Sequence, residues 1–251
     1  MISALLTSLA WLAALLVVFL AVQRWLHRQI YALLWMITHH TNLSVGIFSL
    51  VFFPGILLHE TSHFVMARLL GVRTRNFSLL PKLLPDGSLR LGYVDVAVSD
   101  VVREALIGMA PLLSGGAAVA LTGIYLIPVA PLVELVNRGQ WHLLLVALRS
   151  LPGLPDFWIW FYLVFTISST MLPSASDRRA WLPIALPLLG IALLAVFAGA
   201  GPWMLEHLAP GLQTVLSALL MVLGISLAVH LALGLPVGLA AALLARLTGR
   251  H

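Results

Sequence analysis

The sequence predicts an all-α polytopic membrane protein with about six transmembrane helices and a small cytoplasmic β-hairpin between the second and third. Of the 251 residues, 61% are hydrophobic and only 9% are charged, whereas a soluble domain carries about 25% charged residues. The apolar segments follow one another with short gaps, which indicates a single membrane domain over residues 1–251. The chain contains no cysteine, which excludes disulfides, cysteine nucleophiles and a Cys-ligated zinc site.

Six apolar segments are expected to span the membrane, at about Ile2–Val22, Val45–Leu70, Val102–Leu126, Phe157–Leu172, Ala180–Ala200 and Leu212–Leu235. Between the first two, Ile30–Thr38 is too short to span alone and is expected to be an interfacial or re-entrant helix. An external loop is expected to hold an amphipathic helix near Val133–Leu151. Glu206 and His207 are placed in another external loop, between the last two spans.

Basic residues give the orientation of these spans. The segment Val72–Val101 holds the densest set of Arg and Lys and is therefore placed in the cytoplasm. Arg178, Arg179, Arg246 and Arg250 are placed on the same side. We expect a multi-pass protein of the cell membrane with both termini in the cytoplasm. The net charge of +5 is assigned to these loops, and no nucleic-acid partner is expected.

The basic segment itself has the pattern of a β-hairpin. Pro85-Asp86-Gly87-Ser88 is typical of a turn, and the residues after it are rich in β-branched and aromatic types. A hairpin is expected to pair Arg75–Leu84 with Leu89–Val98. Such a hairpin could bind an extended substrate by strand addition. The alternative is a structural flap with no role in substrate binding.

The second span contains a His-Glu-x-x-His motif at His59, Glu60 and His63. Helix positions i and i+4 share one face, so the two imidazoles can bind one cation. A neighbouring carboxylate can accept a proton from a water molecule whose pKa the cation lowers. An ionisable group at the membrane centre costs on the order of 3 kcal/mol, which favours a functional role over a structural polar cluster.

A catalytic zinc site typically takes three protein ligands, so a third ligand is needed. Asp177 fits because it follows a proline break at the inner end of the fourth span. A helix N-cap, or an ion pair with a neighbouring arginine, is the alternative role for Asp177. Glu104 is a rival on the same side, although a place in a first helical turn explains it. His230, in the last span, is a third candidate, whereas two acids are expected on the opposite side: Asp156 and Glu134.

The third span contains small residues and a proline. Gly108, Gly115 and Gly116 allow other helices to approach closely within a membrane. Pro111 has no backbone N–H and frees a carbonyl oxygen in the middle of the helix. Membrane helices tolerate such a carbonyl where another group satisfies it, so a partner for it is expected.

Taken in order, these features resemble the site-2 protease family of intramembrane zinc metalloproteases. The resemblance covers about Val45 to Arg179. His59, Glu60 and His63 match the His-Glu-x-x-His motif of that family in full. The Ala110–Ser114 stretch is similar to the family's Gly-Pro-x-x-Asn element in its middle span.

The family's second motif, Asn-x-x-Pro-x-x-x-x-Asp-Gly, is matched in part. Pro173 corresponds to its proline, and Asp177 follows four residues later where the family has five. Thr170 stands at the position of the family asparagine, and Arg178 replaces the glycine. The chain therefore resembles a divergent or minimal member.

The resemblance implies a metalloprotease-like core over residues 45–179. Residues 1–44 would add an N-terminal helix and an interfacial segment, and residues 180–251 two further spans. It implies Zn²⁺ held by His59, His63 and Asp177, with Glu60 as the catalytic general base and then acid. The implied substrate is a transmembrane protein, cleaved near the cytoplasmic side, and the lipid bilayer is the other partner. The resemblance assigns no substrate-binding residues and no oligomeric state.

Two other functions are compatible with the same motif. A non-catalytic metal-binding, transport or scaffold protein could use the same His pair, although the remaining acids lie in loops or at span ends, which disfavours transport. Membrane zinc proteases that act on prenylated tails share the motif and take a downstream Glu as their third ligand. The downstream candidates are poorly placed for that role: Glu104, Glu134 and Glu206.

Overall fold

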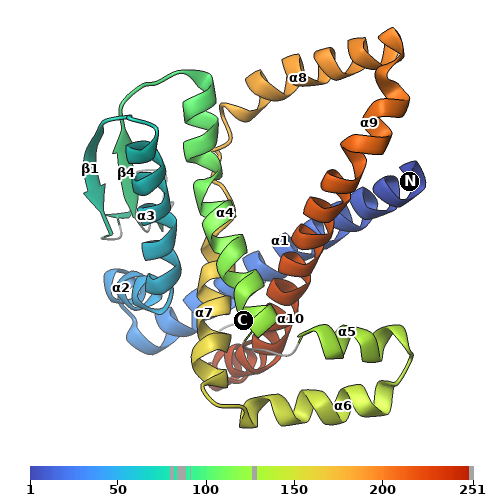
Figure 1. Ribbon diagram of the computed structural model, residues 1–251. Helices are drawn as coiled ribbons and strands as arrows, with labels where there is room; N and C mark the ends of the chain where they lie inside the picture. The colour runs from blue at the N-terminus through green and yellow to red at the C-terminus, as the bar shows by residue number, and fades with distance from the viewer. Residues whose placement is uncertain (80–81, 84–88, 91, 126–128, 249–251) are drawn as a thin grey trace.

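The computed structural model describes residues 1–79, 82–83, 89–90, 92–125 and 129–248. The first half contains α1 (Ile2–Thr38), α2 (Thr41–Val51), α3 (Phe53–Leu69), β1 (Thr74–Ser78), β2 (Lys82–Leu83), β3 (Leu89–Arg90), β4 (Tyr93–Val96) and α4 (Val101–Tyr125). The second half contains α5 (Val129–Asn137), α6 (Trp141–Ser150), a 3₁₀ turn (Leu151–Gly153), α7 (Phe157–Thr170), α8 (Trp181–Ala195), a π-helical turn (Val196–Ala200), α9 (Gly201–His207) and α10 (Ala209–Leu247). Helices thus dominate the fold, as predicted (Figure 1).

Within the described residues, four helical segments are long and apolar enough to cross a membrane: Ile2–Thr38, Val101–Tyr125, Trp181–His207 and Ala209–Leu247. Two sharply bent helix pairs raise the number to as many as six if each pair is one span. These pairs are Thr41–Val51 with Phe53–Leu69, bent by 71°, and Trp141–Gly153 with Phe157–Thr170, bent by 99°. The helical class of the predicted fold is confirmed, and its number of candidate spans is four to six.

The first helix differs from the prediction. A span at Ile2–Val22 and a separate interfacial helix at Ile30–Thr38 were expected, but α1 runs without a break from Ile2 to Thr38. Residues 23–29 contain no glycine or proline that would end a helix. The indole of Trp25 also packs against Gly234 and Gly238 of α10. This distant packing supports the helix where its own sequence becomes polar.

The motif span is also not one straight helix. The segment Val45–Leu70 was expected to form a single span, but α2 ends at Val51 and α3 starts at Phe53. Pro54 explains the bend, because it cannot donate to the carbonyl of Leu50 and its ring would clash with that group. At the far end Gly71 takes a positive φ of 69°, as expected of a helix stop.

The β-hairpin lies between α3 and α4 and is antiparallel, as predicted. Strand β1 pairs with β4 (Phe77 opposite Val94), and β2 pairs with β3 (Leu83 opposite Leu89). A bulge between Thr74 and Phe77 shifts the register by one residue. The predicted turn at 85–88 lies outside the described residues. In Figure 1 the β1–β4 sheet stands beside α3.

Two predictions for the second half are wrong, and a third differs only in its bounds. The single amphipathic helix over Val133–Leu151 is instead the pair α5 and α6, because Gly139 takes a φ of 65° and closes α5. Glu206 and His207 do not lie in a loop: they end α9, which continues the Trp181–His207 segment past a kink at Gly199. The last span is longer than Leu212–Leu235, since α10 extends over Ala209–Leu247.

Among the described residues, the buried apolar side chains form two clusters. A large cluster of buried apolar side chains joins α1, α2, α3, α4, α7 and α10, with Phe19, Phe52 and Val119 fully buried. A smaller cluster of Ala67, Val72 and Ile107 lies beneath the β1–β4 sheet. Helix α3 packs against α4, α7 and the sheet. The motif residues are therefore enclosed by three different elements.

Candidate metal centre

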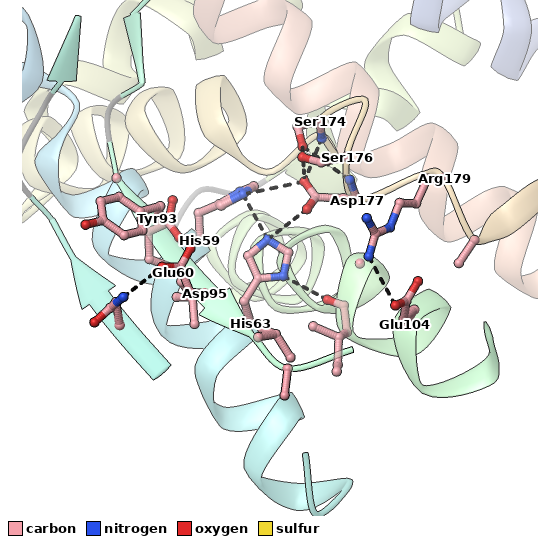
Figure 2. Close-up of a pocket in the computed structure, with 18 of the residues that line it drawn as sticks. His59, Glu60, His63, Tyr93, Asp95, Glu104, Ser174, Ser176, Asp177 and Arg179 are labelled. Carbon is pink, nitrogen blue, oxygen red and sulfur yellow. Dashed lines mark hydrogen bonds and ion pairs between the residues drawn. The ribbon is translucent and has the colours of Figure 1, made fainter. Parts of the chain in front are cut away.

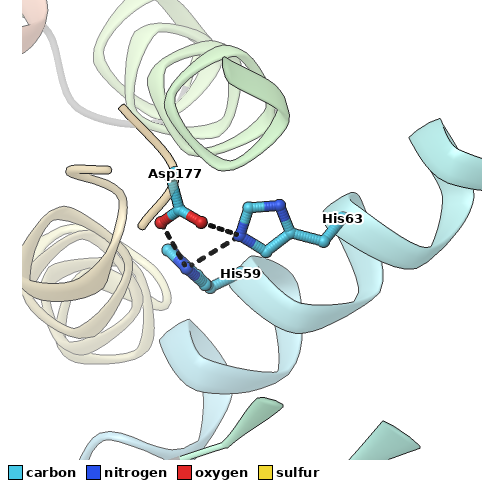
Figure 3. A group of neighbouring side chains, drawn as sticks. All are labelled: His59, His63 and Asp177. Atoms are coloured by element: carbon cyan, nitrogen blue, oxygen red, sulfur yellow. Dashed lines mark hydrogen bonds and ion pairs between the residues drawn. The ribbon is translucent and has the colours of Figure 1, made fainter. Parts of the chain in front are cut away.

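The three predicted metal ligands come together. His59 and His63 lie one turn apart on α3, and their Nε2 atoms are 3.2 Å apart. Asp177, in the segment between α7 and α8, places Oδ1 3.4 Å from His63 Nε2 and Oδ2 4.0 Å from His59 Nε2. One potential ligand atom from each residue lies within 4.8 Å of the others. Figure 3 shows the two rings and the carboxylate facing the same point.

The orientation of His63 depends on a proline in α4. Its Nδ1 is 2.9 Å from the carbonyl oxygen of Ile107. That oxygen would normally accept the N–H four residues later, but this position is Pro111, which has none. The partner expected for the freed carbonyl is therefore His63. Since a carbonyl oxygen only accepts, Nδ1 carries the hydrogen and Nε2 keeps its lone pair.

The orientation of His59 depends on the end of α7. Its Nδ1 is 2.7 Å from the carbonyl oxygen of Thr170, the last residue of that helix. The final carbonyls of a helix lack intrahelical partners, so this oxygen is available to accept from the imidazole. The Thr170 hydroxyl instead donates within its own helix, to the Thr166 carbonyl at 3.1 Å.

The hydrogen bonds of the two imidazoles show that His59, His63 and Asp177 together suit a cation. With hydrogens on both Nδ1 atoms, two Nε2 lone pairs and the Asp177 carboxylate face one another at short range. Such an arrangement of acceptors is repulsive unless a cation or a proton lies between them. Metal-binding histidines commonly donate a hydrogen bond from the N–H of their other ring nitrogen to a backbone carbonyl, as both do here. Two imidazoles and a carboxylate suit Zn²⁺ and other divalent transition metals.

Asp177 is held in place by its own loop and by α4. Its Oδ2 accepts the backbone N–H and the hydroxyl of Ser174, at 2.8 and 2.6 Å. Gly108 of α4 lies directly against the Asp177 backbone, where an added Cβ would collide with the carbonyl group. The glycine therefore allows this loop to approach α4 closely.

The arginines beside Asp177, and the two rival candidates for the third ligand, have other partners. Arg179 pairs with Glu104 at 3.1 Å, and the Arg178 side chain donates to the Ser174 carbonyl. The rival Glu104 therefore has a cationic partner. His230 uses both ring nitrogens elsewhere, Nδ1 at 2.7 Å from the Ser226 carbonyl and Nε2 at 3.0 Å from the Ser169 hydroxyl.

Two other acids were expected to lie away from the centre. Asp156 precedes α7, at the end opposite to Thr170. Glu134 pairs with Arg138 on the surface of α5. Among the described residues, the cluster that could hold a metal consists of His59, His63 and Asp177.

Glu60 lies in the same cavity as these three residues. The cavity has a volume of about 1070 Å³ and is bounded by α3, β4, α4 and the loop that carries Asp177. The Glu60 side chain is only 8% exposed and lies against Gly92, just before β4. An added Cβ at Gly92 would be 2.9 Å from Glu60 Cγ, so the glycine leaves room for the carboxylate. Figure 2 shows Glu60 among the residues that line the cavity.

A polar group on α1 was not assigned to this site from the sequence. Gln23, Arg24 and His27 line a second cavity of about 390 Å³, which His59 and Glu60 also line. Gln23 donates to the Ser169 carbonyl at 2.6 Å, an oxygen that has lost its helical partner because residue 173 is proline. The signal in the sequence was the spacing of these three polar residues, at positions i, i+1 and i+4, which would place them on one side of a continuous helix. A break between two helices was instead expected at this point.

The chain thus builds a potential metal centre from α3, α4 and the loop after α7, with each imidazole oriented by a free carbonyl oxygen. A carboxylate from the same helix turn, Glu60, lines the adjoining cavity. In comparisons with protein-family models, curated proteins and solved structures, the chain matches none of them.

Proposed function

We propose that the protein is an intramembrane zinc metalloprotease that hydrolyses peptide bonds of membrane-spanning proteins. The observation that carries this proposal is the convergence of His59, His63 and Asp177, with Glu60 in the same cavity. The resemblance of the motif helix and of the Pro173–Asp177 region to the site-2 protease family supports it. The apolar helices around the centre support a substrate that reaches it from the bilayer.

The two imidazoles and the Asp177 carboxylate would hold the zinc ion. When bound, zinc would supply Lewis acidity, which lowers the pKa of a water molecule and polarises a carbonyl group. The Glu60 carboxylate would accept a proton from the attacking water and return it to the nitrogen of the leaving amine. Its low exposure limits competition from bulk water for these transfers.

The sheet gives the substrate a place to bind in an extended form. Residues Tyr93–Val96 of β4 line the cavity, and within the described residues β4 pairs with β1 alone. Beyond Tyr93, the edge of β4 that faces away from β1 can hydrogen-bond to an added strand. A transmembrane helix hides its peptide bonds within its own hydrogen bonds, so it must unwind before cleavage. Pairing with β4 would compensate for the backbone hydrogen bonds lost on unwinding.

The test is hydrolysis by a Glu60→Gln variant that still binds metal. Wild type and variant would be reconstituted with zinc in lipid vesicles and given single-span peptides carrying a quenched fluorophore pair. General-base loss is expected to reduce the cleavage rate by about 10²–10⁴-fold, with zinc content unchanged. Glu134→Gln makes the same chemical change on the surface of α5 and is expected to cleave at the wild-type rate.

Cleavage by Glu60→Gln at the wild-type rate would contradict the assignment of the base. Zinc binding without cleavage of any single-span peptide would favour the non-catalytic alternative, a membrane metal-binding or scaffold protein built on the same His pair. Elemental analysis of the same samples separates these outcomes from a simple loss of metal.

A further inference from the structure

The second cavity adjoins the metal centre. It has a volume of about 390 Å³ and shares His59, Glu60 and Gly92 with the larger cavity. The two cavities therefore meet at the motif residues. The larger one is bounded by β4 and the Asp177 loop, and the smaller one by α1, α2 and the end of α7.

The walls of the smaller cavity combine an apolar floor with polar groups. Phe48, Phe52 and Ile56 supply apolar surface, and α1 supplies Arg24 and His27. The His27 ring lies 4.7 Å from the Phe52 ring and 5.8 Å from the Phe48 ring, centroid to centroid. Its Nε2 is buried and has no hydrogen-bond partner among the described residues.

A buried ring nitrogen without a partner is unusual in a folded protein and needs an explanation. A ligand that enters the cavity with a hydrogen-bonding oxygen would satisfy it. In the tautomer with its hydrogen on Nε2, His27 donates a hydrogen bond, and the neighbouring Arg24 guanidinium only donates hydrogen bonds. In that tautomer both groups suit an acceptor such as a peptide carbonyl, while the aromatic floor suits an apolar side chain.

A polypeptide cleaved at the metal centre must continue on both sides of the scissile bond. The larger cavity can hold one side along β4, and the chain that continues past Glu60 meets the smaller cavity. We propose that the smaller cavity binds the substrate polypeptide on that second side. An apolar side chain would occupy the Phe48–Phe52–Ile56 floor, and a backbone carbonyl would accept from His27 and Arg24. This proposal rests on the proposed protease function.

The absence of cysteine from the chain allows a direct test by single-cysteine protection. In zinc-loaded Glu60→Gln protein, cysteine would replace Arg24 in the smaller cavity, Val94 in the larger cavity, or Arg28 as a control. Arg28 lies one turn from Arg24 on α1, is similarly exposed, and lines neither cavity. The measured quantity is the rate of maleimide labelling, with and without an end-capped leucine-rich peptide long enough to fill both cavities.

Peptide at ten times its Kd should slow labelling at positions 24 and 94 by about tenfold, because only the free fraction reacts. Labelling at position 28 should not change. Protection at 94 without protection at 24 would overturn this proposal and leave the protease assignment standing. Protection at neither position would overturn both the proposal and the assigned substrate class.

A second variant, His27→Phe, keeps an aromatic ring in the floor and removes the ring nitrogens. The affinity of the same peptide for the zinc-loaded Glu60→Gln protein should fall about tenfold, the effect of one lost hydrogen bond of ordinary strength. Zinc content should stay the same. Unchanged affinity would overturn the proposal, and so would loss of zinc, because His27 would then belong to the metal centre.

Discussion

Two regions of the molecule use the same residue types, glycine and proline within apolar helices, with different results. In α3 and α4 these glycines meet other backbones: Gly55 lies against Thr166 of α7, and Gly108 against Asp177. In α8 and the π-helical turn that follows it, nothing lies within 4 Å of a Cβ added at Gly190 or Gly199. Figure 1 shows α8 leading away from α4 and α9 returning toward α10.

The difference shows that a proline acts through what lies opposite it. Pro111 is buried, and the carbonyl that it frees accepts from His63. Pro187 lies within α8, a helix with no buried residue. Small residues and prolines therefore do not identify a site by themselves. They take part in one where a second element places a donor or a backbone against them.

The largest effect is expected at Gly108. A methyl group there collides with the Asp177 backbone, so Gly108→Ala should displace the proposed third ligand and reduce zinc affinity by about 100-fold or more. Gly190→Ala is the matched control, because its added methyl group is unopposed. That change should leave zinc binding unchanged and raise stability by about 0.4–1 kcal/mol.

Competition with a zinc chelator would measure the zinc affinity of both variants, and thermal unfolding in detergent would measure their stability. Equal zinc affinity for Gly108→Ala and wild type would show that the Asp177 loop is not held by its contact with α4. Close packing at a glycine would then not distinguish α4 from α8 in its effect on the metal centre.

A smaller effect is expected at Pro111. Alanine restores an N–H at position 111, which would compete with His63 for the Ile107 carbonyl. Loss of such an orienting hydrogen bond typically reduces metal affinity about 10–100-fold. Pro187→Ala in α8 should leave zinc affinity unchanged. Chelator titration of both variants checks this, and equal effects of the two would show that the freed carbonyl does not orient His63.

The smallest effect is expected at the start of α4. The backbone N–H of Arg103, 3.0 Å from Asp100 Oδ1, lowers the pKa of the Asp100 carboxyl. A carboxyl whose pKa is lower in the folded state stabilises the protein above its unfolded pKa of about 3.9. This contribution disappears as the pH falls through the folded value. Asp100→Ala should therefore lower the unfolding temperature slightly at pH 7 and by less at pH 3.

Thermal unfolding of wild type and Asp100→Ala across that pH range is the measurement, with zinc content expected to stay constant. A difference between them that persists unchanged at pH 3 would contradict the capping role. Helix α8 again provides the contrast, since Ala180 at its start makes no side-chain cap.

The sequence was sufficient where the determining interactions are local. The spacing of His59 and His63 places both imidazoles on one helix face, and the turn residues and β-branched run predicted the hairpin. The need for a partner at the carbonyl freed by Pro111 was also predictable. The identity of that partner was not, because it depends on how α3 packs against α4.

The remaining features depend on distant contacts. The continuity of α1 through its polar stretch is supported by Trp25 packing on Gly234 and Gly238, about 210 positions later in the chain. Arg24 and His27, on the same stretch of α1, line a cavity that Glu60 also lines, where the sequence suggested only a break between helices. The proline that explains the bend, Pro54, is visible in the sequence. The apolar run on both sides of it nevertheless favoured a single straight span.

The most direct test of the three-ligand metal centre is the zinc content of the purified protein, measured by elemental analysis. Asp177→Asn and Asp156→Asn make the same change near opposite ends of α7, and only Asp177 lies in the cluster. We predict about one zinc ion per chain for wild type and Asp156→Asn, with loss of zinc in Asp177→Asn and His63→Ala. Zinc retained in full by Asp177→Asn, or absent from wild type after incubation with the metal, would contradict the three-ligand centre.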